Sequence, residues 1–533
     1  MEIIDETKNN QDEEKKEYDD EFGLYRMWSA ISFSVMLIVI GVPLWWKTTE
    51  VYRAPLPYDE IHALDPSQTE IKTTIFIYSE YPTHANAIMQ GLSISFKKLS
   101  IFNVDIKPFK IDIEPISFDA VENSSAIHPT KAGQILLVEV PSLPYNDKVL
   151  VSTNRIIYFT YNDDSDLIAQ VIMQWFFEEK ALINKVTSII SPQKTNIGEE
   201  NSNRLRAALG YDVIFTIINS DPENVNFSWD VKNDVNGYMQ PLLSQISKVS
   251  SHAIKSQWLY LMDLGEVPRK DESGWYTYKF SQLPHIITPL EKKLGSGISK
   301  NPCIHMILYV AGCSVNPLCF LSSDELRVEG MMSPQWGAVQ ILNPTEENCV
   351  NHTQVKFSPK DIMSIFISQF HALLGIREKV RKNGVNFMAL KGPSLRTWEL
   401  DSLYRIRTVE QITSASLTLQ SLSKLLGEIN NIVINEDVAS SINVAVSNVK
   451  KAVTALKLGD LDKAMETSSV AFGAAETAFS DPSLLSLLYF PDDQKYAVYI
   501  PLFLPIMIPV IMSLKRTYSW LVQRKLTTHE KTE

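Results

Sequence analysis

The pair of residues that best suits nucleophilic catalysis is Cys303 with His305. A thiolate nucleophile needs a nearby imidazole to take its proton, and both residues fall in the apolar run NPCIHMILYV. Residues two apart in a strand point to the same face. Catalytic pairs, however, usually come from separate loops, and a disulfide at Cys303 would consume the thiol. The pattern favours a structural role for both residues over a thiol hydrolase.

A second candidate site is the acidic run YNDDSD, which contains Asp163, Asp164 and Asp166. Hard cations bind several carboxylates at close range, and many lumenal glycosyltransferases hold a metal and a sugar nucleotide with such a cluster. The same residues directly precede a helical pattern. There, Ser165 or Asp166 can cap the helix and the negative charges face its positive dipole end. Capping is the favoured interpretation.

The common enzyme signatures are absent from the sequence. It contains no G-x-x-x-x-G-K-[ST], no G-x-G-x-x-G after a strand, no G-x-S-x-G and no H-E-x-x-H. The formal charge of −12 comes without a basic run long enough to follow a phosphate backbone. We therefore predict no catalytic, cofactor-binding or metal-binding residue, and no nucleic-acid partner.

The glycosylation acceptors and the cysteines all lie in residues 47–495, the part of the chain that the membrane spans described below would place in an oxidising lumen. The Asn-x-Ser/Thr acceptors begin at Asn123, Asn226 and Asn351. In such a compartment one or two disulfides can form with three full pairings open, or the thiols can stay free and buried. The four cysteines are Cys303, Cys313, Cys319 and Cys349.

Two apolar runs predict membrane-spanning helices near the ends of the chain. Residues 27–46 carry no charge, and a helix of 20 residues is about 30 Å long, which matches the hydrocarbon core of a bilayer. A cleaved signal peptide is the competing interpretation, but the preceding tail is long and acidic and no small-x-small cleavage site follows. Residues 496–514 form the second run. The polar, basic residues after it indicate a stop-transfer segment rather than a removable anchor signal.

Basic residues beside the spans predict that both termini are cytoplasmic and that residues 47–495 are lumenal. Residues 1–26 have a net charge of −6 and the last 19 residues a net charge of +3. The basic residues that decide the orientation are Lys8, Lys15, Lys16 and Arg26 before the first span, Lys47 and Arg53 after it, and the five of the C-terminal tail.

The second span carries Pro501, Pro505 and Pro509 on one helical stripe. Each proline removes a backbone donor, and an interior proline costs about 3 kcal/mol in a water-soluble helix. Freed carbonyls find no water in bare lipid. We therefore predict that this stripe makes an intramembrane contact with other transmembrane helices, ordered water or a lipid headgroup. A lone, kinked span is the competing interpretation. Ala30 and Ser34 give the first span a small-xxx-small pair, a weak sign of helix packing.

Between the spans the pattern predicts a mixed α/β lumenal domain over 47–395, with two subdomains as an option, followed by an antiparallel helical unit over 396–480. Apolar residues from Leu400 to Ile429 recur at helical spacing and predict one apolar face. A second helix covers about 437–458, Gly459 suits its C-terminal cap, and Asp460 can cap a third helix. The expected strands are 71–78, 134–140, 149–158, 213–218, 258–262, 304–310 and 338–342, and the expected helices are 84–99, 166–189, 237–252 and 361–376. The remaining segments are an acidic tail (1–26), a juxtamembrane segment (481–495) and a basic tail (515–533).

Three segments resemble the phosphatidylinositol glycan class S (PIG-S) family. They are GVPLWWKTTEVYRAPLPYDEI at 41–61, TWELDSLYRIRTVEQITSASLTLQSLSKLL at 397–426 and LLYFPDDQKYAVYIPLFLPI at 487–506. The plan of two terminal spans around a lumenal domain agrees as well, whereas the middle of the domain matches only loosely.

The resemblance implies a noncatalytic scaffold subunit of the glycosylphosphatidylinositol (GPI) transamidase in the endoplasmic reticulum membrane. That complex replaces a C-terminal signal of a proprotein with a GPI lipid. The implied partners are a catalytic cysteine-protease-like subunit, PIG-T, PIG-U and the GPI anchor attachment subunit, with GPI lipid or proprotein as further candidates. The family offers no catalytic residue to transfer. A lumenal membrane-anchored enzyme and a lumenal receptor or tether remain as alternatives.

Overall fold

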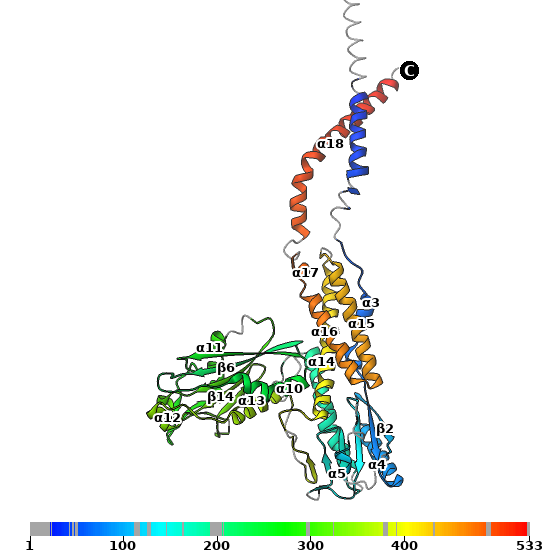
Figure 1. Cartoon of the computed structure of the whole chain (residues 1–533). Helices are drawn as coiled ribbons and strands as arrows, with labels where there is room; N and C mark the ends of the chain where they lie inside the picture. Colours follow the sequence, from blue (N-terminus) through cyan, green and yellow to red (C-terminus); the bar gives the residue numbers. More distant parts are fainter. Residues whose placement is uncertain are drawn as a thin grey trace, which may run out of the picture. The chain divides into compact units, whose positions relative to one another are not determined.

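The structure is a computed structural model of the chain, drawn in Figure 1. It describes residues 22, 24–41, 43–44, 47, 52–110, 118–124, 129, 131–144, 147–161, 165–191, 205, 207–294, 299–322, 324–376, 382–390, 392–429, 432–486 and 492–529. These residues form two compact units. The smaller unit comprises residues 1–56, 423–440 and 478–533, and the larger comprises 57–422 and 441–477.

The larger unit contains a six-stranded sheet in the order β15-β4-β5-β3-β1-β2. β1 pairs in parallel with β2 on one side and with β3 on the other. β1 alternates between buried and half-buried residues, as its alternating apolar sequence IKTTIFIY predicts. The strands are β1 (Ile71–Tyr78), β2 (Phe102–Pro108), β3 (Ile135–Glu139), β4 (Val149–Val151), β5 (Ile156–Phe159) and β15 (Val385–Phe387). The helices between them are α4 (Pro82–Phe96), α5 (Phe118–Glu122), α6 (Ser165–Val171), η4 (Ile172–Phe177) and α7 (Glu179–Ile190).

A second, five-stranded sheet has the order β13-β14-β10-β6-β7. β6 is buried at all ten positions, which fits a central parallel strand covered on both faces. The strands are β6 (Gly210–Asn219), β7 (Ser251–Tyr260), β10 (Cys303–Val310), β13 (Gly330–Ser333) and β14 (Gly337–Leu342). Its helices are α9 (Val231–Asp234), η5 (Val235–Met239), α10 (Gln240–Gln245), α11 (Leu283–Lys293), α12 (Glu346–Asn351) and α13 (Pro359–Leu374).

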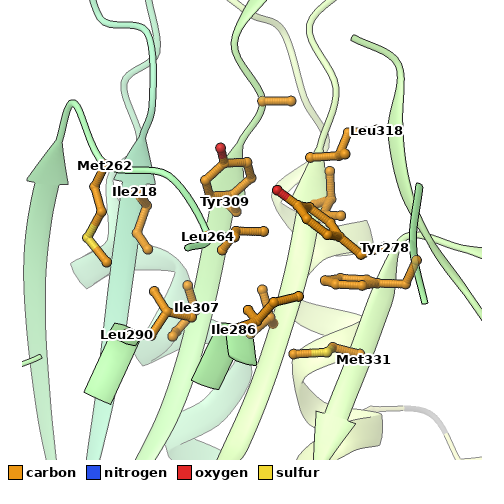
Figure 2. Packing of buried hydrophobic residues seen from close by; sticks show 14 of the residues in the cluster. Ile218, Met262, Leu264, Tyr278, Ile286, Leu290, Ile307, Tyr309, Leu318 and Met331 are labelled. Carbon is orange, nitrogen blue, oxygen red and sulfur yellow. The ribbon is translucent and has the colours of Figure 1, made fainter. Parts of the chain in front are cut away.

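A small four-stranded sheet, β12-β11-β9-β8, packs into the same core. Figure 2 shows Tyr278 of this sheet near Ile307 and Tyr309 of β10 and near Ile286 of α11. All four side chains are at most 2% exposed, so one apolar layer joins the two sheets. The strands are β8 (Arg269–Lys270), β9 (Tyr276–Lys279), β11 (Leu318–Leu321) and β12 (Arg327–Val328).

Three long helices follow the sheets: α14 (Thr397–Glu428), α15 (Glu436–Leu458) and α16 (Leu461–Phe479). The predicted boundary between the second and third helices is confirmed. Gly459 has a φ of +78°, a left-handed conformation that favours glycine. The Asp460 carboxylate accepts a hydrogen bond from the Lys463 backbone N–H at 3.1 Å, as a cap does.

The predicted apolar face of α14 is buried, with Leu403, Ile412 and Leu426 at most 3% exposed, but burial in the first part of the helix is not confined to that face. Every residue from 401 to 413 is buried, including charged ones. Periodicity revealed the apolar stripe, but it could not reveal that the polar side of the helix is also covered.

Two other expected elements are divided in the structure. The expected strand 149–158 is the antiparallel hairpin of β4 and β5, because Ser152 and Asn154 form a turn in the middle of the apolar run. The expected helix 166–189 is broken at Glu178, whose φ of 47° is left-handed, so α6 and η4 end there and α7 starts. Residues 237–252 are helical only to Gln245, and β7 begins at Ser251.

Within the described residues, the helix from Leu24 to Gly41 is long and apolar enough to cross a membrane. It begins three residues before the predicted span, and its last turn is the π-helical turn η1 (Leu37–Gly41). The second predicted span lies inside α18 (Asp492–His529), several side chains of which fall outside the described set. The second span stays a prediction.

Candidate functional site

The first part of α14 places charged side chains inside the larger unit. Asp401 is 2% exposed, and its carboxylate accepts two hydrogen bonds from Arg155, at 2.6 Å from Nε and 2.8 Å from Nη2. The same carboxylate accepts the backbone N–H of Gly133 at 2.9 Å. A buried carboxylate is tolerated when it is paired and fully hydrogen-bonded. Asp401 therefore fixes the segment before β3 to α14.

Arg405 lies one turn further along the helix and is 2% exposed. It donates to the carbonyl oxygens of Phe176 at 3.0 Å and Gly133 at 3.3 Å. The rings of Phe102 and Phe177 stack on each other, and the guanidinium lies about 6 Å from both ring centroids. Burial lowers the pKa of Arg405, and the Asp401 carboxylate opposes that shift.

Glu410 forms a second buried charge cluster between two cations. Its carboxylate lies 2.7 Å from Arg407 and 2.9 Å from Lys185, and Arg407 also donates to the carbonyl oxygen of Leu205 at 3.1 Å. Burial alone would raise the pKa of Glu410, but Arg407 and Lys185 outweigh it and the pKa is lowered. These groups are not accessible to a substrate. Their chemistry is the positioning of α14 against the sheets.

We predict that Glu410→Gln lowers the free energy of unfolding by about 3 kcal/mol, because the buried Arg407 and the half-buried Lys185 then lack a counter-charge. Since the folded pKa of Glu410 is lowered, its stabilising charge is present above its unfolded pKa of about 4.3 and is lost as the pH falls further. Thermal unfolding of the full chain measures the change. Glu428→Gln, on the exposed end of the same helix and 4.0 Å from Lys424, should change stability by less than about 0.5 kcal/mol. Equal losses in both variants would contradict the assignment.

In the smaller unit, the stalk after the first predicted span pairs with the loop between α14 and α15. The Ala54 N–H donates to the Ile434 carbonyl oxygen at 2.9 Å, and the Ile434 N–H donates to the Tyr52 carbonyl oxygen at 3.1 Å. Arg53 donates to the carbonyl oxygen of Leu426, and the Tyr52 hydroxyl donates to Glu436. Ala54 and Ile434 are at most 3% exposed. We call residues 52–54, 426 and 432–436 the juxtamembrane junction.

The segment that leads to α18 contacts the same loop. Asn435 donates from Nδ2 to the Ser483 hydroxyl at 3.3 Å and accepts the Val438 N–H at 2.8 Å, so it also caps α15. Leu484, in the short helix α17 (Pro482–Ser486), is 3% exposed. The chain therefore attaches both of its terminal segments at one loop.

The structure joins two of the four cysteines. Cys313 and Cys349 form a disulfide with a Cα–Cα distance of 5.8 Å, which confirms that the chain contains a disulfide. Cys319 and Cys303 are not in disulfides, and Cys319 is 1% exposed.

The Cys303–His305 pair lacks the features of a catalytic dyad. The Cys303 sulfur lies 3.7 Å from the carbonyl oxygen of Asn301. The His305 ring packs against Trp336 at 5.2 Å between centroids, and the side chain is 2% exposed. Burial lowers the pKa of His305 to about 4, so the imidazole is neutral at pH 7 but is enclosed. The structural interpretation of both residues fits these contacts.

His305→Phe should make the molecule less sensitive to acid. The folded pKa of His305 is about 4 and its unfolded pKa is about 6.5, so the unfolded state takes up the proton first as the pH falls below 6.5. Linkage then removes about 2 kcal/mol of stability by pH 5, and the phenylalanine variant should avoid this loss. Hydrogen exchange of β10 at pH 7 and pH 5, corrected for intrinsic rates, measures it. His62→Phe, at an exposed position, should keep the wild-type pH dependence. An unchanged dependence in His305→Phe would show the pKa argument to be wrong.

The acidic run is placed only in part. Asp163 and Asp164 lie outside the described residues, and Asp166 accepts a hydrogen bond from the Ser95 hydroxyl at 3.2 Å in the first turn of α6. Among the described residues, no group of three or more His, Cys, Asp or Glu side chains could hold a metal ion.

The glycosylation acceptors and the proline stripe lie on the surface. Asn123, Asn226 and Asn351 are exposed, as glycosylation requires, and their use stays a prediction. Pro501, Pro505 and Pro509 lie inside α18 and are exposed. No membrane or partner chain surrounds them, so the proposed intramembrane contact also stays a prediction.

The charge network of α14 and the contacts of the juxtamembrane junction are not evident from the sequence. The matched segments 41–61 and 397–426 marked the right stretches of chain. Charged residues in a helical pattern usually indicate an exposed face, however, so Asp401, Arg405 and Glu410 gave no sign of burial.

The chain is similar to proteins of one family along most of its length. The family model for phosphatidylinositol-glycan biosynthesis class S protein matches residues 32–524. A Bos taurus protein named GPI-anchor transamidase component PIGS is 34% identical over 92% of this chain and 94% of its own length. The Homo sapiens protein of the same name is 32% identical with the same coverage. A Schizosaccharomyces pombe protein named GPI transamidase component PIG-S homolog is 24% identical over 94% of this chain and 85% of its own length.

Proposed function

This chain belongs to the phosphatidylinositol-glycan biosynthesis class S family, and from that premise we propose that it is a noncatalytic scaffold subunit of the GPI transamidase complex. In this role it acts in the endoplasmic reticulum membrane, where GPI anchors are attached to the C-termini of proproteins. Its partners are the catalytic cysteine-protease-like subunit, PIG-T, PIG-U and the GPI anchor attachment subunit.

The observation that supports the scaffold role comes from residues 397–426, one of the segments that resemble the family. Its charged residues Asp401, Arg405 and Glu410 are buried rather than exposed, and each one is hydrogen-bonded. An enzyme would need such groups beside a substrate cavity. In this chain they fix α14 against strands and backbone carbonyls, which supports a rigid body that presents its surface to partners.

The juxtamembrane junction supports the same role. A scaffold on a membrane needs a firm connection between its terminal segments and the rest of the chain. The stalk bonds between Tyr52 and Ile434 and the Asn435–Ser483 contact attach both terminal segments to the loop at the end of α14. Two attachments at one loop restrict the motion of these segments more than a single attachment does.

Deletion of the gene followed by rescue tests this function. Loss of the chain should remove GPI-anchored proteins from the cell surface, and the wild-type chain should restore them. Cys303→Ser and Asp164→Ala should restore them fully, because a scaffold needs neither a thiol nor a metal-binding carboxylate. Arg53→Ala should restore them by less than about half, because it removes the bond to the Leu426 carbonyl of the α14 end. Lys47→Ala, at an exposed position of the same stalk, serves as the matched control.

The outcomes separate the alternatives. Unchanged surface display after deletion would reject the transamidase assignment. Failure of Cys303→Ser or Asp164→Ala to rescue, with normal expression, would support a lumenal enzyme instead. Equal rescue by Arg53→Ala and Lys47→Ala would leave the family assignment in place and reject the role of the junction.

The proposed topology places both termini in the cytoplasm and residues 47–495 in the lumen. We expect added protease to spare this body in sealed microsomes and to reach it after detergent. Single Asn→Gln changes at Asn123, Asn226 and Asn351 should each remove one glycan, seen as a gel shift of about 2–3 kDa, which follows from the bulk of an attached glycan. A body cleaved in sealed microsomes would contradict the topology.

A further inference from the structure

The two large sheets share one local topology. In each, the first strand lies between the third and the second, in the orders β3-β1-β2 and β10-β6-β7, and all these pairs are parallel. The chain passes from β1 to β2 on one side and then returns to β3 on the other. Such a reversal is a topological switch point, and ligands of open α/β sheets bind there, beyond the carboxyl ends of the strands.

The switch point of the five-stranded sheet is filled by its own chain. At the end of β6, the Asn219 side chain donates to the Val225 carbonyl oxygen at 3.0 Å, and the Ser220 hydroxyl donates to the Val310 carbonyl oxygen at 2.9 Å. A Cβ added at Gly312 would lie 3.1 Å from the Cβ of Asp221. The loop that follows β6 therefore packs against the end of β10.

The switch point of the six-stranded sheet carries a cluster of polar and aromatic side chains instead. Glu139 ends β3, and one of its oxygens lies 2.9 Å from His84 Nδ1 while the other accepts the Ser79 hydroxyl. Tyr161, which follows β5, stacks on the His84 ring with 3.6 Å between centroids and an interplanar angle of 10°. Tyr81 lies 4.9 Å from the same ring. Residues from the ends of β1, β3 and β5 thus meet at one place.

This cluster combines a fixed polar centre with accessible rings. Tyr81 and Tyr161 are 56% and 42% exposed, whereas the side chains of His84 and Glu139 are 25% and 11% exposed. With Nδ1 bonded to Glu139, the Nε2 atom of His84 is left to hydrogen-bond a ligand. The remaining lone pairs of the Glu139 carboxylate are also acceptors. The cluster can therefore accept hydrogen bonds from a ligand beside two partly exposed tyrosine rings, of which Tyr161 stacks on His84 with one face.

The charges of the cluster exclude the anions that switch points often bind. Glu139 lies next to the first turn of α4, and that turn begins with Pro82, which has no N–H to donate. A phosphate or carboxylate would meet a negative charge there. A metal ion is not favoured either, because the described residues offer one imidazole and one carboxylate at this place and no group of three ligands.

We propose that Tyr81, His84, Glu139 and Tyr161 form a carbohydrate-binding site that takes one hexopyranose unit of a glycan. A pyranose has an apolar C–H face and a rim of hydroxyl donors, and it is uncharged. Its apolar face would pack on an exposed tyrosine ring, and its hydroxyls would donate to Glu139 and to His84 Nε2. A few placed polar groups beside aromatic side chains are the general composition of small-molecule sites. This inference holds independently of membership in the transamidase.

Saturation-transfer NMR with the full chain tests the site. The protein is held in a sugar-free amphipol after enzymatic removal of any N-glycans, and the probes are α-1,2-mannobiose, N,N′-diacetylchitobiose and lactose. At least one sugar should bind saturably with a Kd of roughly 1 mM, the range expected for a small open site. Tyr161→Ala and Glu139→Gln should each weaken that sugar about five- to tenfold, as loss of one aromatic or charged contact predicts. Tyr161→Phe keeps the ring and should bind like the wild type.

Controls make each result decisive. Tyr260→Ala removes a tyrosine that is also 56% exposed but lies on β7, and it should leave binding unchanged. Thermal unfolding confirms that the Glu139→Gln chain is folded. Binding that survives both Tyr161→Ala and Glu139→Gln, or no binding by any of the three sugars, would overturn the proposal. Ethanolamine phosphate is the competitor. If it displaced the sugar at a concentration below the Kd of the sugar, the proposal would also be overturned, because the site would then recognise an amine.

Discussion

The larger unit depends on keeping Asp401 and Arg405 charged inside it. An unpaired buried ion would destabilise the fold by several kcal/mol, so each needs a full set of partners. One peptide group serves both: Gly133 donates its N–H to Asp401 and accepts Arg405 at its carbonyl oxygen. Arg155, at the start of β5, completes the set. α14 therefore has one register against the sheet, because a shift by one residue would leave two charges without partners.

Much of the secondary structure was predictable because it follows from local patterns. The run 71–78 alternates in the sequence, and β1 has the same bounds. Gly459 and Asp460 mark the end of α15 and the start of α16 by turn chemistry alone. The predicted element boundaries were wrong where contacts between residues distant in the sequence determine the local structure. The hairpin of β4 and β5 has the sequence pattern of one apolar run, and no glycine or proline marks the break at Glu178, where η4 packs on the sheet through the Phe177–Phe102 ring pair.

The functional groups were less predictable, since topology rather than spacing brings them together. His84 and Glu139 are 55 residues apart, and they meet because β1 and β3 are parallel neighbours. No pattern in a single sequence specifies that β3 lies beside β1. The juxtamembrane junction is similar, because Tyr52 pairs with a loop 382 residues later in the chain. Resemblance pointed to segments 41–61 and 397–426, yet it said nothing of Asn435 or Ser483.

In the smaller unit, the loop that contains Asn435 contacts both the N-terminal stalk and the segment that leads to α18. Its Oδ1 accepts the Val438 N–H and so holds the first turn of α15, while its Nδ2 donates to Ser483 in the first turn of α17. Its neighbour Ile434 exchanges backbone bonds with the stalk residues Tyr52 and Ala54. The cap of α15 and the two attachments thus share adjacent residues. Loss of either attachment would free a donor or acceptor at the start of α15, so the helix and the junction should loosen together rather than one at a time.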